Sequence, residues 1–161
     1  MFPQLSKIRA VIFDWDGTLL DSYSADLSAY LAMFRALKIS WGEAELRRNY
    51  SPDWYRIYRA ARIPRESWQR ADRLWRLHYA RQSAALLPGA EAAIARLRNN
   101  FKLGLVTSGS RSRVLRQLSG FGMTRIFAAR IYSESVEQRK PHPAPLRMAL
   151  QKMRIAPAEA L

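Results

Sequence analysis

Three short runs of apolar residues stand out along the chain, each followed by small or polar residues. They cover residues 9–14, 103–107 and 126–132, and they contain β-branched and aromatic residues. Short runs of this kind, bounded by turn-forming residues, are typical of buried β-strands. The pattern therefore predicts three strands, and the first of them ends at Asp14.

Between the first and second runs, apolar residues recur at every third or fourth position, which is the spacing of an amphipathic helix. Such stretches cover residues 27–37, 54–61 and 68–78, and Pro52 and Pro64 punctuate them. Four of the five tryptophans lie between residues 41 and 75. We expect this aromatic stripe to form the core of a helix bundle, since a cofactor site would need further signals.

Helices are also predicted after Pro88-Gly89, from about Arg111 to Leu118 and from about Ala144 to Met153. Strands that alternate with helices indicate an α/β fold with a doubly wound parallel sheet, whose active site lies at the carboxyl ends of the strands. The expected organisation is an α/β core formed by residues 1–16 and 88–161, with an inserted α-helical segment formed by residues 17–87.

The net charge of +14 comes from 27 basic and 13 acidic residues among 161, and only five of the basic residues are lysines. A positive field attracts phosphate-bearing partners. The arginines are dispersed over apparent helix faces without zinc-finger or RNA-binding spacing, so nucleic-acid binding is not expected. The sequence has no cysteine, which excludes disulfides and thiolate chemistry. No signal peptide or membrane span is apparent, and a soluble cytoplasmic protein is expected.

Asp14 and Asp16 flank Trp15 at the end of the first predicted strand. Side chains two positions apart in an extended chain leave on the same side. Two carboxylates this close repel each other unless a cation lies between them, which favours a hard divalent ion such as Mg²⁺. One carboxylate can then attack phosphorus. An Asp-X-Asp-Gly turn that only caps a loop is the alternative, and the preceding VIF and following TLLDS weaken it.

Three segments together resemble the haloacid dehalogenase (HAD) superfamily. VIFDWDGTLLDS is similar to its first motif, LGLVTSGS to its second and SVEQRKPHPAPL to its third, in the family's order. The helical segment lies where the phosphoglycolate-phosphatase-like branch carries an α-helical cap. The resemblance implies a HAD-like, Rossmann-like core and Mg²⁺-dependent hydrolysis of a small phosphorylated substrate.

The resemblance also implies a role for each site residue. Asp14 would be the nucleophile that forms an aspartyl-phosphate, and its carboxylate would bind Mg²⁺. Asp16 would protonate the leaving group and then activate water, while its backbone carbonyl binds the metal. Thr107 would hold the phosphate through its hydroxyl, with the Ser108 amide beside it. Lys140 would neutralise charge on the nucleophile and the phosphate.

Asp16 narrows the range of reactions that the superfamily resemblance allows. The dehalogenases generally lack this second aspartate, because release of a halide needs no acid. Its presence favours phosphate-ester chemistry, and an isomerase that resembles phosphoglucomutases stays open because the cap and motifs are shared.

The superfamily's fourth motif, an apolar strand that ends in an acidic pair, is expected directly after residues 155–161. The resemblance implies that it supplies the remaining metal carboxylate and that its strand lies beside the first. Residues 1–161 are therefore expected to be a fragment, incomplete at the C-terminus, with little activity alone. The alternative is a non-catalytic remnant that binds anions or a protein partner through its basic surface.

Four further polar residues have simpler expected roles. Asp21 and Ser22 are expected to cap a helix, although they could touch substrate at the cap hinge. His78 is expected to pack within a helical stripe, and His142 to fix a loop between two prolines.

Ten arginines lie between Arg47 and Arg81, and the cap that carries them is expected to cover the phosphate pocket.

Overall fold

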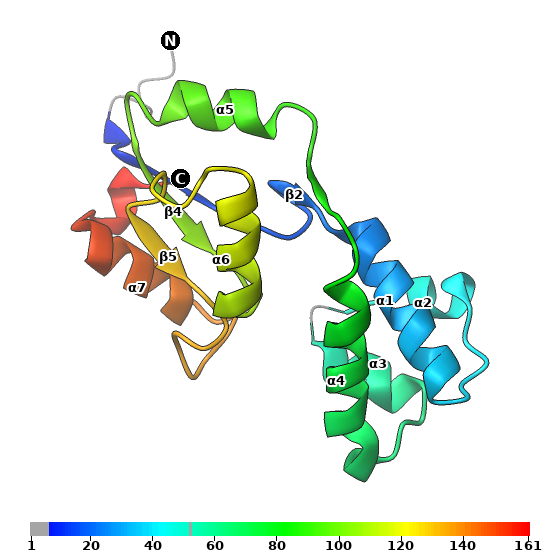
Figure 1. Ribbon diagram of the computed structural model, residues 1–161. Coiled ribbons are helices and arrows are strands. Elements are labelled where there is room, and N and C mark those ends of the chain that lie inside the picture. Colours follow the sequence, from blue (N-terminus) through cyan, green and yellow to red (C-terminus); the bar gives the residue numbers. More distant parts are fainter. Residues whose placement is uncertain (1–6, 52) are drawn as a thin grey trace. The chain divides into compact units, whose positions relative to one another are not determined.

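The computed structural model describes residues 7–51 and 53–161, which form two compact units. One unit, called the α/β unit here, contains the chain up to Leu20 together with Leu86–Leu161. The other, called the helical unit, contains Asp21–Ala85. Figure 1 shows the elements of both units along the chain.

The α/β unit is built on a three-stranded parallel sheet. Its strands are β1 (Ala10–Phe13), β4 (Lys102–Val106) and β5 (Ala129–Ile131), in the order β1-β4-β5. The central strand β4 is buried from its second residue to its last, as expected for a parallel strand that is covered on both faces. The predicted α/β class and parallel sheet are confirmed.

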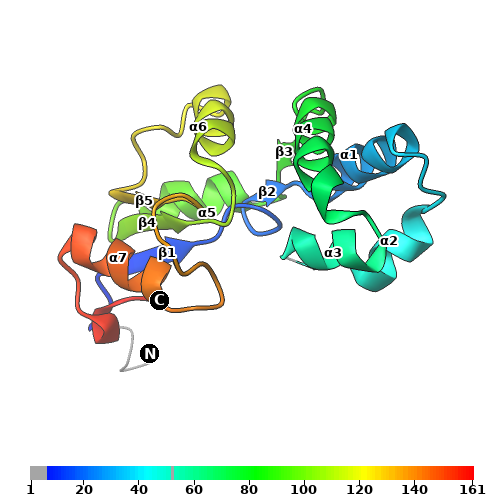
Figure 2. The ribbon, with the colours of Figure 1, turned by 90° about the horizontal axis from the view of Figure 1, so that it is seen from below.

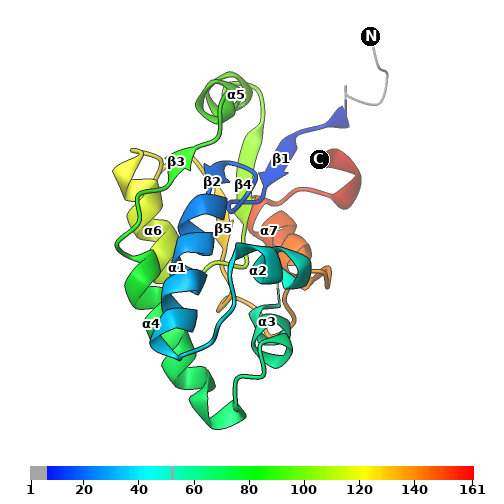
Figure 3. The same cartoon turned by 90° about the vertical axis from the view of Figure 1, so that its right-hand side faces the viewer.

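Helices cover both faces of this sheet. The unit contains α5 (Ala90–Leu97), α6 (Arg111–Gly120), α7 (Ala144–Met153) and the short 3-10 helix η3 (Pro157–Glu159). Helices α6 and α7 lie on opposite sides of the strands (Figures 2 and 3). From α7, Ala149 and Met153 pack with Val106 and Ile131 in one buried cluster. This packing fixes the carboxyl ends of β4 and β5.

Strand β5 is shorter than its apolar run. A strand was expected over residues 126–132, but Ile126 belongs to a turn in which its N–H donates to the Met123 carbonyl at 3.2 Å. Phe127 is buried without joining the strand. Apolar character at this position therefore reflects core packing, which periodicity cannot distinguish from strand pairing.

The end of the sequence runs beside β1. Ala160 forms a parallel bridge with Ala10. The Leu161 N–H donates to the Ala10 carbonyl at 3.1 Å, and the Ile12 N–H donates to the Leu161 carbonyl at 2.7 Å. The edge of β1 opposite β4 is thus paired along part of its length.

The helical unit contains α1 (Tyr23–Ala36), α2 (Glu43–Asn49), α3 (Trp54–Ala60), the 3-10 helix η2 (Arg65–Ser67) and α4 (Trp68–Tyr79). At its boundary, the two-residue strands β2 (Leu20–Asp21) and β3 (Ala85–Leu86) pair with each other. Helix α2 and these two strands were not predicted. Leu46 is the only buried residue of α2, so the helix has no apolar periodicity to detect.

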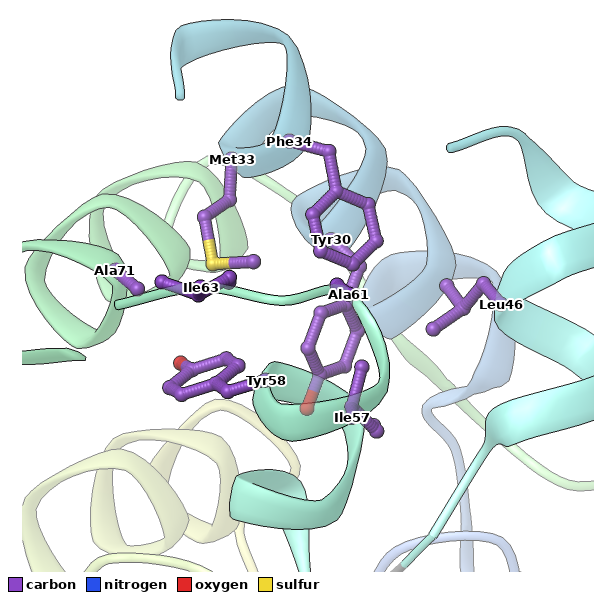
Figure 4. Close-up of a cluster of buried hydrophobic side chains, with 9 residues drawn as sticks. All are labelled: Tyr30, Met33, Phe34, Leu46, Ile57, Tyr58, Ala61, Ile63 and Ala71. Carbon is purple, nitrogen blue, oxygen red and sulfur yellow. The ribbon is translucent and has the colours of Figure 1, made fainter. Parts of the chain in front are cut away.

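Aromatic and aliphatic side chains from all four helices form the core of the helical unit (Figure 4). The tryptophans Trp41, Trp54, Trp68 and Trp75 are partly buried against it, which confirms that the aromatic stripe is core. Polar atoms within this core are bonded: the Tyr58 hydroxyl donates to Asp72 Oδ1 at 2.9 Å. The buried cluster consists of Tyr30, Met33, Phe34, Leu46, Ile57, Tyr58, Ala61, Ile63 and Ala71.

Candidate active site

Asp14 lies directly beyond the carboxyl end of β1, and its carboxylate meets the ammonium of Lys140. Lys140 Nζ is 2.7 Å from Asp14 Oδ1, and it also donates to the Val106 carbonyl, the last of β4, at 3.3 Å. The side chains of Lys140 and Asp14 are 31% and 39% exposed, so a solute can reach the pair. The segments that carry the first and third sequence motifs therefore meet at one end of the sheet.

Thr107 follows the last residue of β4 and is almost fully buried. Its Oγ1 accepts a hydrogen bond from the Gly109 N–H at 2.9 Å and lies 3.5 Å from Asp16 Oδ2. Ser108, the next residue in this turn, is half-buried. The carboxyl ends of β1 and β4 thus bring a threonine hydroxyl next to the second aspartate.

Trp15 separates the two aspartates, and a tight turn begins at its carbonyl. The Trp15 carbonyl accepts from the Leu19 and Leu20 amides at 3.0 and 2.9 Å, and Gly17 has φ +74°, a left-handed conformation that glycine adopts without strain. The Trp15 side chain is fully buried. Its backbone N–H donates to Asp14 Oδ1 at 2.7 Å, so the turn also orients the first carboxylate.

The Asp16 carboxylate has a cationic partner that the sequence did not reveal. Arg113, on α6, donates from Nη1 to Oδ1 and from Nη2 to Oδ2, both at 2.7 Å. This is a two-pronged ion pair, and the Arg113 side chain is only 15% exposed. Each aspartate at the site is therefore matched with its own cation, Asp14 with Lys140 and Asp16 with Arg113.

The remaining candidates have structural positions. Ser22 precedes α1 but makes no side-chain capping hydrogen bond, because its backbone is already helical at φ −93°, ψ −8°; the expected capping role was wrong for this residue. Asp21 is exposed and His78 is half-buried on α4. His142 Nδ1 accepts from the Ala144 N–H at 3.2 Å, which agrees with a role in fixing the loop.

The ten arginines between Arg47 and Arg81 are all exposed. Three of them pair with acids on the same unit, and these pairs are Arg47–Glu43, Arg48–Glu45 and Arg59–Asp53, at 2.9, 3.1 and 3.2 Å. Solvated pairs of this kind contribute little to stability. That arginines of the cap cover the phosphate pocket stays a prediction.

The donor set at the site suits magnesium but does not enclose it. Asp14 and Asp16 offer hard oxygen ligands, and Mg²⁺ is commonly held by one or two carboxylates together with waters and substrate phosphates. No group of three or more His, Cys, Asp or Glu residues that could hold a metal occurs within the described part of the chain. The residues present fit an open magnesium site that substrate would help to complete.

None of the helices within residues 7–51 and 53–161 is long and apolar enough to cross a membrane.

Comparison with known proteins gives consistent results. Residues 11–161 match the family described as haloacid dehalogenase-like hydrolase. A phosphoglycolate phosphatase from Cereibacter sphaeroides is 38% identical over 151 residues, which cover 85% of this chain and 68% of that protein. The pyrophosphatase PpaX from Oceanobacillus iheyensis is 27% identical over 159 residues, which cover 96% of this chain and 73% of that protein.

Solved structures agree with the sequence matches. The crystal structure of CbbY from Rhodobacter sphaeroides in complex with phosphate is 26% identical, with a TM-score of 0.78, and covers 96% of this chain and 76% of that chain. The predicted resemblance is confirmed. Since the match extends over nearly all of the sequence and is supported by a relative of 38% identity, this chain belongs to the haloacid dehalogenase-like hydrolases.

Proposed function

We propose that this chain is a magnesium-dependent phosphohydrolase that cleaves a small phosphorylated metabolite through an aspartyl-phosphate formed on Asp14. The observation that carries the proposal is the convergence of Asp14, Asp16, Thr107 and Lys140 at the carboxyl ends of β1 and β4. An accessible carboxylate that lies 2.7 Å from an ammonium suits attack on an anionic phosphoryl group, because the cation offsets the charge that both reactants carry.

Each residue has a defined task in the proposed reaction. A carboxylate oxygen of Asp14 bonds to phosphorus as the bond to the leaving oxygen breaks, and Asp16 donates a proton to that oxygen. Asp16 then takes a proton from the water that attacks phosphorus, which releases phosphate and restores Asp14. The Thr107 hydroxyl and the Ser108 amide hold the phosphoryl oxygens, and Lys140 neutralises their charge.

Magnesium would be held by the Asp14 carboxylate and the Asp16 backbone carbonyl, and when bound it supplies positive charge that lowers the repulsion between nucleophile and phosphate. With one carboxylate and one carbonyl as its protein ligands, the ion is expected to bind weakly until substrate phosphate adds further oxygens. We therefore expect slow turnover.

A compact phosphate ester is the proposed substrate class. The named relatives are a phosphoglycolate phosphatase and a pyrophosphatase, names that point to a small phosphate ester and a small phosphate anhydride. The helical unit is proposed to act as the cap that selects among such compounds and excludes water. Its exposed arginines would favour a substrate that carries a second anionic group.

Hydrolysis of a generic aryl phosphate and of a panel of phosphorylated metabolites, with and without Mg²⁺, tests the proposal. We expect slow turnover that requires Mg²⁺, continues to rise as Mg²⁺ is added, and is lost in Asp14→Asn. Asp53→Asn is the matched control, because Asp53 is exposed in the helical unit and asparagine also caps helices.

Two outcomes would contradict separate parts of the proposal. Rapid turnover at low Mg²⁺ would show that these two ligands suffice, and would overturn only the account of weak metal binding. Folded protein that hydrolyses no compound in excess Mg²⁺ would favour the alternative, a non-catalytic protein that binds anions or a partner through its basic surface.

A further inference from the structure

Arg113 is held in place from several sides. Its guanidinium makes the two-pronged pair with Asp16, with both N–O distances at 2.7 Å. Nη1 also lies 3.5 Å from Gln117 Oε1, which accepts a hydrogen bond from the buried indole N–H of Trp15 at 2.9 Å. The turn that carries both aspartates is therefore joined to α6 through Arg113 and Gln117.

The backbone beside the guanidinium is shaped to admit it. Gly109 lies in the turn between β4 and α6, and a Cβ atom at this position would overlap Arg113 Nη2 and approach Val114 Cγ2 to 2.8 Å. Any larger residue would displace the guanidinium from Asp16. Gly109 also donates its N–H to Thr107 Oγ1. The same glycine therefore orients the threonine hydroxyl and leaves room for the arginine.

This geometry fixes the direction of the Asp16 carboxylate. A planar guanidinium matches a carboxylate in two parallel hydrogen bonds, which restrict rotation more than a single contact does. A carboxyl group has about four lone-pair positions. Arg113 takes two of them and the Thr107 hydroxyl lies 3.5 Å from Oδ2, so about one position stays open to carry the proton that passes to the leaving oxygen. Proton transfer depends first on such placement.

We propose that Arg113 is a positioning residue for Asp16, which it holds in the orientation needed for proton transfer to the leaving group. The proposal rests on the proposed function, because it assigns Arg113 to the reaction through Asp16. It predicts that loss of Arg113 slows the reaction by a factor that depends on the leaving group. Esters with alkyl leaving groups require a proton from Asp16, whereas aryl esters with stable phenolate leaving groups scarcely do.

The kinetic test compares release of the leaving group from one alkyl and one aryl phosphate in the first turnover, in excess Mg²⁺, because the second step is the same for both esters. Arg113→Met should slow first-turnover release from the alkyl ester by about a hundredfold, the loss typical of a misplaced catalytic group, and leave first-turnover release from the aryl ester nearly unchanged. Arg113→Lys keeps the positive charge but loses the planar, two-pronged geometry, so it should retain only part of the activity on the alkyl ester. Arg116→Met, an exposed position on the same helix, is the matched control and should behave as the unchanged protein.

A second readout does not require activity. A guanidinium held by two hydrogen bonds rotates slowly, so Arg113 Nη1 and Nη2 should give separate NMR signals that merge in Asp16→Asn. Absence of separate signals in the unchanged protein, or their persistence in Asp16→Asn, would overturn the proposal. If the unchanged protein hydrolyses neither ester, the proposed function fails, and the NMR signature alone decides whether Arg113 holds Asp16.

Equal loss of first-turnover release from both esters in Arg113→Met would also overturn the proposal, because it would show that Arg113 only joins the turn to α6. If Arg113→Met does not fold, the kinetics of Arg113→Lys and the NMR spectrum of Asp16→Asn test the proposal instead. Both of these variants keep the volume of the site.

Discussion

At the scale of single residues, the site depends on matching each aspartate with a separate cation. Lys140 meets Asp14 from a loop, while Arg113 meets Asp16 from a helix. Two carboxylates that lie close together repel each other, and each cation relieves that repulsion locally. The lysine is a compact charge on a flexible stem, suited to follow a phosphoryl group, whereas the arginine holds one fixed geometry.

Lys140→Met should therefore impair chemistry rather than folding. We expect turnover to fall by about 10²–10³, the cost of removing one group that stabilises developing charge, with little change in thermal stability because the pair is partly exposed. Lys152→Met is the control, since Lys152 is exposed on α7. Steady-state kinetics and thermal unfolding measure the two effects. Unchanged turnover in Lys140→Met would remove Lys140 from the proposed machinery.

At the scale of elements, α4 carries its charge differently from α2. On α2, Arg47 and Arg48 lie within one helical turn of Glu43 and Glu45, with which they pair. On α4, Arg70, Arg73 and Arg76 follow one another at three-residue steps, and all three are exposed. Like charges at this spacing repel and weaken a helix. Substitutions on the exposed face of α4 can therefore raise the stability of the helical unit.

Arg70→Glu should stabilise the helical unit by about 0.5 kcal/mol, because it removes a repulsion, creates an attraction to Arg73 and places an acid in the first turn of a helix. Arg47→Gln should lower stability slightly, since it removes the pair with Glu43. Urea unfolding followed by tryptophan fluorescence reports on this unit, which contains four of the five tryptophans. A lower midpoint in Arg70→Glu would refute the argument.

The elements also show what sequence patterns can and cannot predict. The meeting of Asp14 and Thr107 could be predicted, because the carboxyl ends of parallel strands meet at one edge of a sheet. Lys140 is placed there only by the resemblance of its motif. Arg113 could not be predicted, since an arginine on a helix resembles a solvated residue until its partner is known. Strands β2 and β3 have two residues each, which is too short for any periodicity to appear.

At the scale of the whole molecule, the chain combines an α/β unit that carries the candidate site with a helical unit that has its own core. Family membership and the two named phosphatase relatives agree with phosphate chemistry. The basic charge of +14 is consistent with an anionic substrate. The central claim that unites these features is that Asp14 becomes covalently phosphorylated.

The most direct test of that claim is mass spectrometry of the peptide that contains Asp14, after acid quenching of protein incubated with excess Mg²⁺ and a reactive phosphoryl donor. The account predicts a phosphoryl group on Asp14 that accumulates in Asp16→Asn, because water is then activated poorly, and that is absent in Asp14→Asn. A phosphoryl group on another residue, or turnover in which Asp14 never carries one, would contradict the account.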